Sequence, residues 1–297
     1  MKRLLRLAFL AALLVTAGSA AGPADYLQSV EQWRAGRLDR LTRPDGWLAL
    51  IGRHPLEVGL WSVGSAPGNA IRLAAGPEHL GTITRTGDNT VTFTLADGVD
   101  ATIDGTTERT APLAYGRNVQ PTYVRAGTVN FCILEQNGRL FLRVRDSESA
   151  RRKNFAGLGH YPVDPAWRIE AVWVPFDPPR TLRILNVLGH TEDATCPGKA
   201  VFTLDGRSFE LLPVQDEPGD DLFFILSDAT AGAETYEASR FLYSSPPQDG
   251  KVVLDFNKLY NPPCAFTPFT TCPLPPKENV LPVPIRAGEK KYPGDAP

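Results

Sequence analysis

Two patterns of apolar and polar positions divide the chain. In residues 23–43, apolar side chains recur every three to four positions with charges between them, at Tyr26, Val30, Trp33 and Leu38. This spacing predicts an amphipathic helix. From Trp47 onwards the period becomes two, and turn residues such as Asp97-Gly98 separate the runs. The second pattern predicts β-hairpins.

Short strands are predicted through the rest of the chain. Residues 130–135 and 140–146 flank Asn137-Gly138, a strong signal for a two-residue hairpin turn. Further β-branched or aromatic runs lie at 82–84, 90–95, 101–103, 169–174, 181–187, 199–204, 209–214, 222–226, 241–243 and 252–256. Regular strands without helices between them favour antiparallel sandwiches or barrels over a Rossmann-type sheet.

The expected fold is mainly β, with an N-terminal helix and a β-sandwich packed against a second antiparallel barrel or sandwich. A single core is hard to extend beyond about 250 residues, so two packed subdomains are expected. The 26 glycines and 27 prolines suit many short strands joined by turns. The predicted segments are a signal peptide at 1–21, the helix at 22–45, a sandwich at 46–115, and at 116–297 an antiparallel β domain with a Pro-rich C-terminal segment.

The first residues have the composition of a secretory signal peptide. Three basic residues precede an apolar run at 7–15, which ends in small residues at 17–21. The run is well short of the roughly 20 apolar residues that span a bilayer, so cleavage near Ala20 or Ala21 is expected rather than a membrane anchor. The sequence therefore predicts a secreted or periplasmic protein without membrane association after cleavage.

Charge and motifs argue against several partners. The formal net charge is −2 at pH 7, and no Lys/Arg run interleaved with aromatic residues occurs, so nucleic acid is not expected. GxGxxG, P-loop and GxSxG motifs are absent, which removes common nucleotide-binding and serine-hydrolase interpretations. We expect no cofactor and no metal, because the chain has no CxxC and no histidine close to a cysteine.

Four cysteines follow the predicted signal peptide, and an even number favours disulfides. Cys264 and Cys272 have a spacing that can close a loop, which leaves Cys132 and Cys196 as the second pair. Four cysteines allow three connectivities, so sequence does not prove the pairing. A catalytic thiol at Cys264 is the alternative, although no base neighbours it in the sequence.

Polar residues of the second half suggest a ligand site. A basic cluster surrounds one turn, and the carboxylates Asp228, Asp255 and Glu289 follow later; the cluster comprises Arg143, Arg145, Arg151, Arg152 and Lys153. Guanidinium groups present several donors in one plane and suit a small anionic or carbonyl-bearing ligand. The alternative is that these charges only tie strands together. The predicted ligand-binding residues are Arg151, Arg152, Asp228, Tyr236, Arg240, Asp255, Asn257, Tyr260 and Asn261.

Two local patterns support this set. Asp228-Ala229-Thr230 fits a turn closed by Asp and Thr side chains, from which Tyr236 and Arg240 would project into a cavity. Asp255 and Asn257 lie two apart on a predicted strand and should face the same side. With Tyr260 and Asn261 they form either a pocket wall or an anchor for the Pro-rich tail.

The C-terminal motifs resemble a known family. Its signature includes residues 254–257, 260–266, 272–276 and 285–290, together with 151–158, 161–168, 228–230, 235–236 and 240–242. This pattern is similar to DUF1684, a bacterial and archaeal family known as a domain of unknown function. The resemblance covers roughly Tyr26 to Lys290. It implies a shared fold and candidate positions, and it carries no assigned activity.

A weaker resemblance lies in the N-terminal half. Residues 62–65, 69–73, 76–81 and 103–105 occur in an order similar to a forkhead-associated (FHA) domain. A phosphothreonine-binding FHA domain has Arg and Ser at the positions that Ser65 and Pro77 occupy here. Without that guanidinium the phosphate loses a bidentate partner, so phosphopeptide binding is not expected. His79 is expected to close a loop through its ring nitrogens.

Two functions stay open, and the sequence does not decide whether the protein is an enzyme. The first is a secreted binding or structural module that holds a small molecule. The second is an extracytoplasmic hydrolase with Asp228 or Asp255 as general base and Arg240 stabilising negative charge. We favour the first, because no nucleophile and base pair is evident and the catalytic residues stay unassigned. Carboxylates converging in a cavity would favour the second.

Overall fold

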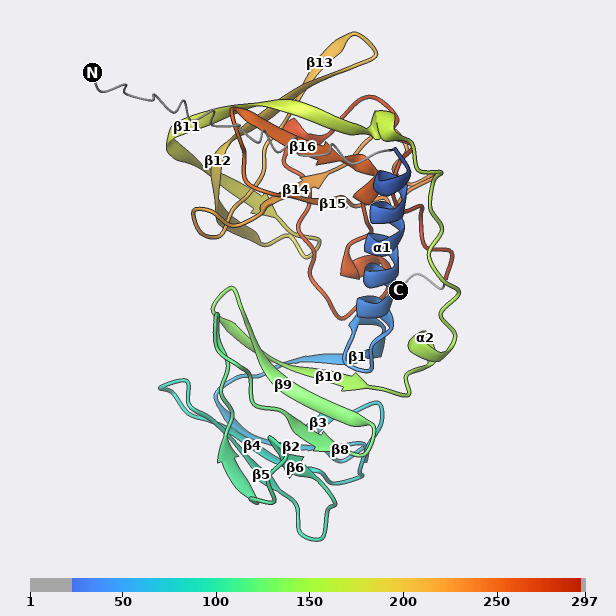
Figure 1. Ribbon diagram of the computed structural model, residues 1–297. Helices are drawn as coiled ribbons and strands as arrows, with labels where there is room; N and C mark the ends of the chain where they lie inside the picture. The colour runs from blue at the N-terminus through green and yellow to red at the C-terminus, as the bar shows by residue number, and fades with distance from the viewer. Residues whose placement is uncertain (1–22, 295–297) are drawn as a thin grey trace, which may run out of the picture.

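The computed structural model describes residues 23–294 as two β-rich units joined by α1 (Pro23–Thr42) (Figure 1). The fold is mainly β with several antiparallel sheets, including a half-barrel, as the sequence predicts. The predicted signal peptide, residues 1–21, lies outside the described residues. Between residues 23 and 294, no helix has the length and apolar composition that crossing a membrane requires.

The sandwich unit (residues 50–146) consists of two five-stranded sheets. The first contains β1 (Leu50–Pro55), β6 (Thr102–Ile103), β8 (Val124–Ala126), β9 (Val129–Gln136) and β10 (Arg139–Asp146), in the order β1-β10-β9-β8-β6. The second contains β2 (Gly59–Gly64), β3 (Ile71–Arg72), β4 (Gly81–Arg85), β5 (Val91–Leu95) and β7 (Thr110–Pro112), in the order β3-β2-β4-β5-β7. One shared apolar core fills the space between the sheets, where Phe93 meets Phe131 edge to face at 5.1 Å.

The C-terminal unit (residues 168–289) contains the remaining sheets. A four-stranded sheet has β11 (Arg168–Leu185), β12 (Thr191–Leu204), β13 (Arg207–Leu211) and β16 (Lys251–Asp255), in the order β13-β12-β11-β16. A two-stranded sheet pairs β14 (Leu222–Leu226) with β15 (Arg240–Ser244). The Pro-rich segment after β16 packs against their common core through Leu281, Val283 and Ile285.

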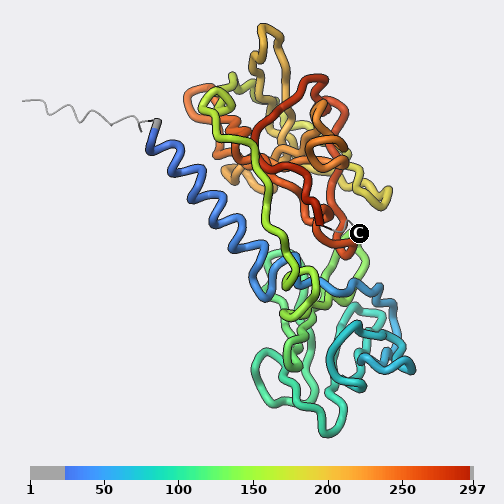
Figure 2. Tube along the Cα trace, turned by 90° about the vertical axis from the view of Figure 1, so that its right-hand side faces the viewer, coloured from blue at the N-terminus to red at the C-terminus, as the bar shows by residue number. Residues whose placement is uncertain are grey.

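Two segments bridge the units: α1 by its contacts, and the chain itself after β10. Figure 2 shows α1 descending to the sandwich and the segment after β10 returning to the C-terminal unit. This segment includes the short helix α2 (Ala150–Lys153) and the 3-10 turn η2 (Pro165–Trp167). Further 3-10 turns are η1 (Trp47–Ala49), η3 (Phe256–Lys258), η4 (Pro263–Ala265) and η5 (Lys277–Asn279). Arg152 of α2 holds the end of α1 beside the segment after β10, because it donates to the carbonyls of Thr42 at 2.7 Å and Ser147 at 2.8 Å.

The helix is confirmed, and its buried face differs in part from the predicted one. Val30 and Leu41 are fully buried, whereas Leu38 is 42% exposed. Arg37 takes the buried position one turn before Leu41 because it has partners in the C-terminal unit. The helix face therefore follows a buried ionic contact as well as apolar spacing.

The hairpin around Asn137-Gly138 lies in the sandwich unit, whereas the sequence placed it with the C-terminal segment. β10 pairs with β1 from Phe141 to Arg145, and both hairpin strands send alternate side chains into the sandwich core. The periodicity identified the strands correctly. It carried no information on their partner, since β1 precedes β10 by more than 80 residues.

The loop expected to depend on His79 is closed by other side chains. His79 is exposed. The hydroxyl of Ser65 donates to the carbonyl of Gly76 at 2.9 Å, and Asn69 donates to the carbonyl of Glu78 at 2.8 Å. The prediction for His79 is wrong, because two short polar side chains already satisfy the loop backbone.

Candidate functional site

Asp228 and Arg240 form an ion pair in the core of the C-terminal unit. Their residues are 5% and 1% exposed. Nη1 of Arg240 donates to Oδ2 of Asp228 and to the carbonyl of Ile285, both at 2.9 Å, while Nη2 donates to the carbonyl of Ala287. Burial lowers the pKa of Arg240, and the Asp228 carboxylate opposes this shift. The pair ties the C-terminal segment to β15.

The turn after β14 closes as the sequence predicts. Oδ1 of Asp228 accepts from the Thr230 amide at 2.9 Å, the Thr230 hydroxyl at 2.6 Å and the Ile285 amide at 3.1 Å. The hydroxyls of Thr230 and Thr235 lie 2.8 Å apart. Both oxygens of Asp228 are thus engaged by the protein itself. Tyr236 packs among apolar side chains of the C-terminal unit and against a cluster that includes Leu41 of α1 and Leu48.

A second buried ion pair joins α1 to the end of the chain. Nε of Arg37 donates to Oε1 of Glu289 at 3.2 Å, and Nη2 donates to the carbonyl of Asn261 at 2.9 Å. The other carboxylate oxygen accepts from the Asn261 amide at 2.8 Å. Burial raises the pKa of Glu289, and the Arg37 guanidinium opposes this shift. Asn261, predicted as a ligand residue, is a structural partner here, and its side-chain amide donates to the carbonyl of Lys290 at 2.8 Å.

Asp255 and Asn257 anchor both α1 and the chain before β11. The Tyr26 hydroxyl donates to Oδ1 of Asp255 at 2.7 Å. Asn257 donates to the Tyr26 oxygen at 2.9 Å and exchanges two hydrogen bonds with the backbone of Asp164, at 2.8 Å and 3.1 Å. Oδ2 of Asp255 faces the Lys258 ammonium at 3.3 Å, at the edge of a surface cavity of about 610 Å³.

The predicted basic cluster does not form one patch. Arg152 is held by backbone carbonyls, Lys153 pairs with Glu148 at 2.7 Å, and Arg151 lies over the ring of Phe269 at 5.5 Å. Arg143 and Arg145 lie on β10 in the sandwich unit. No contact in the described chain brings Arg151 or Arg152 to Asp255 and Asn257, with which they were predicted to bind a ligand.

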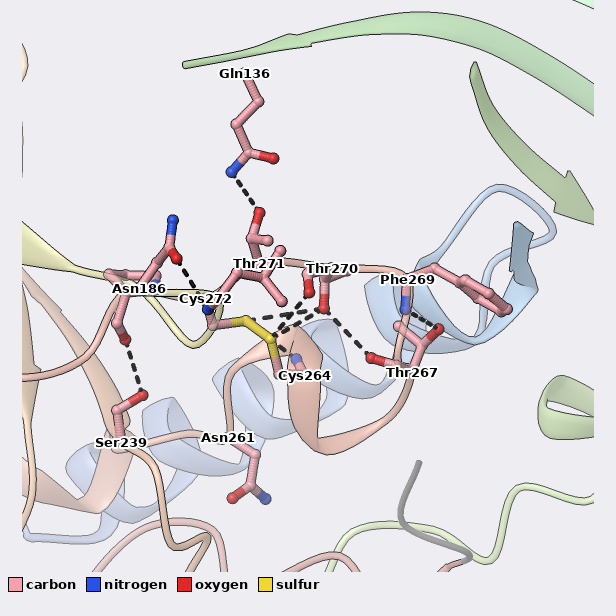
Figure 3. The surroundings of a disulfide bond; sticks show 12 residues. Gln136, Asn186, Ser239, Asn261, Cys264, Thr267, Phe269, Thr270, Thr271 and Cys272 are labelled. Carbon is pink, nitrogen blue, oxygen red and sulfur yellow. Dashed lines mark hydrogen bonds between the residues drawn. A yellow bond between two sulfur atoms is a disulfide. The ribbon is translucent and has the colours of Figure 1, made fainter. Parts of the chain in front are cut away.

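The disulfide between Cys264 and Cys272 is present, as predicted (Figure 3). Their Cα atoms are 6.1 Å apart. The Thr270 hydroxyl donates to Sγ of Cys264 at 3.1 Å, and next to the bridge Gln136 of the sandwich donates to the hydroxyl of Thr271. The bridge thus fixes a loop that contacts both units.

The predicted second disulfide is wrong, since Cys132 and Cys196 are both free and buried. Cys132 lies on β9 in the sandwich and Cys196 on β12 in the C-terminal unit. The Cys196 thiol donates to the carbonyl of Gly198 at 3.2 Å, and burial raises its pKa. Pairing by elimination failed because the two strands belong to different sheets.

A groove of about 430 Å³ lies where α1, β14 and β15 meet. Five aromatic rings follow one another along it, with centroids 4.7 Å, 4.9 Å, 5.8 Å and 6.2 Å apart, in the order Tyr243, Phe223, Phe241, Tyr260 and Trp33. We call this cavity the ring groove. Tyr260 is the residue of the predicted ligand set that lines it. Burial raises the pKa of the Tyr260 hydroxyl, so the phenol stays protonated at neutral pH.

The charged side chains that line the ring groove are all basic. Arg37, Arg40 and Lys258 line it, and none of its described lining residues is acidic. The Arg37 guanidinium stacks over the Tyr260 ring at 4.7 Å, and Lys258 pairs with Asp255 behind it. Arg40 is exposed, and no ion pair engages it within the described chain. Aromatic walls with cations suit a ligand that has a flat face and an anionic or carbonyl group.

Sequence reasoning missed most of the groove, although two signals were available. Arg37 lies seven residues after Val30 on the buried face of the predicted helix, and a charge at such a position indicates a buried partner. In β14, Leu222 and Phe224 face the main core while Phe223 and Ile225 are apolar on the other side. A strand that is apolar on both faces indicates a second packing surface.

The described chain offers no group of three or more His, Cys, Asp or Glu side chains that could hold a metal ion. The protein is mainly β and consists of two packed units. In its C-terminal unit, the polar residues Asp228, Arg240 and Glu289 are buried in ion pairs.

Comparisons with known proteins give the family. Residues 153–290 match the family described as "Protein of unknown function (DUF1684)", and the chain belongs to this family. The solution NMR structure of an uncharacterised protein from Haloarcula marismortui is 30% identical, with 48% of this chain and 80% of that chain covered and a TM-score of 0.41. No curated protein matches. The FHA-like residues 62–105 precede the matched region, and that resemblance stays a prediction.

Proposed function

We propose that the protein binds a small molecule in the ring groove, with the ligand's flat face on the aromatic rings and an anionic or carbonyl group near Arg40. The observation that carries this proposal is the combination of a continuous row of rings with cations and no acidic lining residue. A ligand pocket of this kind is mostly apolar, with a few polar groups that fix orientation.

The hydrolase alternative has less support from the geometry. A general base needs a carboxylate within reach of a substrate proton. Asp228 accepts hydrogen bonds on both oxygens in the core. Asp255 lies at a cavity edge, where Tyr26 donates to one carboxylate oxygen and the Lys258 ammonium lies 3.3 Å from the other. Arg240 is equally engaged by backbone carbonyls. Binding is the function that these contacts favour.

The test is a thermal-unfolding screen of the purified protein against aromatic carboxylates, acidic sugars and neutral sugars. A ligand for the groove should raise the melting temperature of the wild type. Tyr243→Ala and Arg40→Gln should each abolish most of that rise, because both side chains line the groove. Neither change should unfold the protein, since Tyr243 is 52% exposed and Arg40 is exposed. Leu60→Ala, at another exposed apolar position in the sandwich, is the control. A ligand-induced rise that persists in both groove variants would overturn the site.

We also propose that the protein is exported and that its signal peptide is removed. The charged start, short apolar run and small residues at 17–21 support this, and a disulfide such as Cys264–Cys272 persists best in an oxidising compartment. Mass spectrometry of the protein expressed from its full sequence in a bacterial host should find a new N-terminus near residue 21 or 22 in the extracytoplasmic fraction. An intact Met1 in the cytoplasmic fraction would contradict export.

A further inference from the structure

A second cavity, of about 490 Å³, lies on the sandwich unit. It forms on the outer face of the first sheet, because Val129, Phe131 and Ile133 of β9 and the even-numbered residues 140–144 of β10 face the core. Cys132, Arg143 and Arg145 lie at intervening positions, and Arg143 is directly opposite Cys132 in the strand register. All three line the cavity, as does Tyr123.

Two arginines in this cavity lack an acidic partner. Arg145 is only 9% exposed, and its one hydrogen-bond contact is a long one, from Nη1 to Sγ of Cys132 at 3.9 Å. Arg143 lies over the Trp47 ring at 5.5 Å. The Nε atoms of both side chains are buried without a hydrogen-bond partner. Within residues 23–294, no ion pair engages either guanidinium.

Neighbouring charges do not compensate for them. Arg53 of β1 lies directly opposite Arg143 and adds a further positive charge. Glu135 is the acidic residue that lines the cavity, and it is exposed and forms no ion pair with either arginine. Arg117, also in the lining, pairs with Asp216 at 2.8 Å. Burial and the charge of Arg145 lower the pKa of Arg143 to about 10.

We propose that this cavity is a binding site for a small oxoanion, held by the guanidinium groups of Arg143 and Arg145. Guanidinium groups present parallel N–H donors that match the oxygens of phosphate, sulfate or carboxylate. Arg145 is buried and Arg143 is half-buried. Without a counterion these two cations repel each other and lose hydration, which lowers stability, and a bound anion would restore it. This cavity and the ring groove share no lining residue, and they are neighbours through Trp47, which lines the groove and lies under Arg143.

The experiment compares wild type and three variants by calorimetric titration and thermal unfolding. The probes are inorganic phosphate, sulfate and malonate, each added to protein in anion-poor buffer. Wild type should bind at least one probe and gain several degrees in melting temperature. Binding to phosphate rather than malonate would identify a phosphate-type group, and the reverse would identify a carboxylate.

The variants decide whether Arg143 and Arg145 hold the anion. Arg145→Met and Arg143→Met should each weaken binding at least about tenfold, and Arg145→Met should raise the melting temperature of the anion-free protein. Arg139→Met is the matched control, because Arg139 is on the same strand, is exposed and pairs with Glu57, and does not line the cavity. The proposal is overturned if the wild type binds none of the probes, or if both cavity variants bind as the wild type does. Tyr243→Ala should leave the anion response intact, which separates this test from the ring groove.

Discussion

The two units bury arginine in opposite ways. Arg240 of the C-terminal unit, and Arg37 of α1, which inserts into the same unit, each reach a carboxylate and a backbone carbonyl oxygen within 3.2 Å. In the sandwich unit, Arg143 and Arg145 have a thiol and a ring near them and no carboxylate partner in the described chain. The same residue type therefore serves two purposes. A paired buried guanidinium fastens segments together, whereas an unpaired one next to a cavity is available to a ligand.

This difference also explains the family signature. Residues 228, 240, 257, 261 and 289 attract attention as polar residues in a Pro-rich setting, yet their partners are one another, the backbone, and Tyr26 and Arg37 of α1. Their hydrogen bonds and ion pairs hold residues 281–289 against β15, and they hold α1 against the C-terminal unit. The ring groove is formed beside these ties, and it depends on them for its shape.

The largest effect is expected from Arg240→Met. Removing this partner leaves the Asp228 carboxylate buried without a counterion, which typically costs about 3–5 kcal/mol. The free energy of unfolding from urea titration should fall by that amount. The double variant Arg240→Met with Asp228→Leu should recover part of it, because no charge is left uncompensated. A double variant less stable than Arg240→Met alone would contradict the ion-pair account.

A smaller and pH-dependent effect is expected from Arg37→Met. At pH 8 the free energy of unfolding should fall by about 1.5–3 kcal/mol, since a charged hydrogen bond to Glu289 is lost. Burial already raises the folded pKa of Glu289, and removing Arg37 raises it further. The folded variant then holds a proton that the unfolded chain has released, so its stability rises as pH falls towards the unfolded pKa. Urea titrations at pH 8 and pH 5 should show the deficit shrinking at pH 5, and an equal deficit at both would contradict this.

The smallest effect is expected from Arg286→Gln. Arg286 donates to Glu234 at 2.8 Å, but the two side chains are 59% and 39% exposed. Solvent and salt screen such pairs. The unfolding midpoint should not change measurably, and a change as large as that of Arg37→Met would show that exposure does not separate the two kinds of pair.

Much of the fold could be predicted, because period-two patterning depends on local sequence. Residues 222–226 and 252–256 were predicted as strands, and β14 and β16 lie there. Strand pairing could not be read in the same way. β11 runs unbroken from Arg168 to Leu185 where two short strands were expected, since an irregular pairing between Pro175 and Arg180 carries it past the prolines.

The candidate site was predictable only in part. The Asp228–Thr230 turn follows from neighbouring residues, so its pattern is visible in the sequence. Arg37 and Glu289 are 252 positions apart, and only the fold shows that they meet. The five rings of the groove likewise come from α1, β14, β15 and the segment after β16, so no local motif contains them.

Pairing decides what a buried arginine does in this protein. The most direct test measures the free energy of unfolding of Arg240→Met and Arg145→Met side by side, in the same anion-poor buffer. The account predicts opposite signs, with Arg240→Met less stable than the wild type and Arg145→Met more stable. A comparable loss of stability in both variants would contradict it, because Arg145 would then be a structural tie like Arg240.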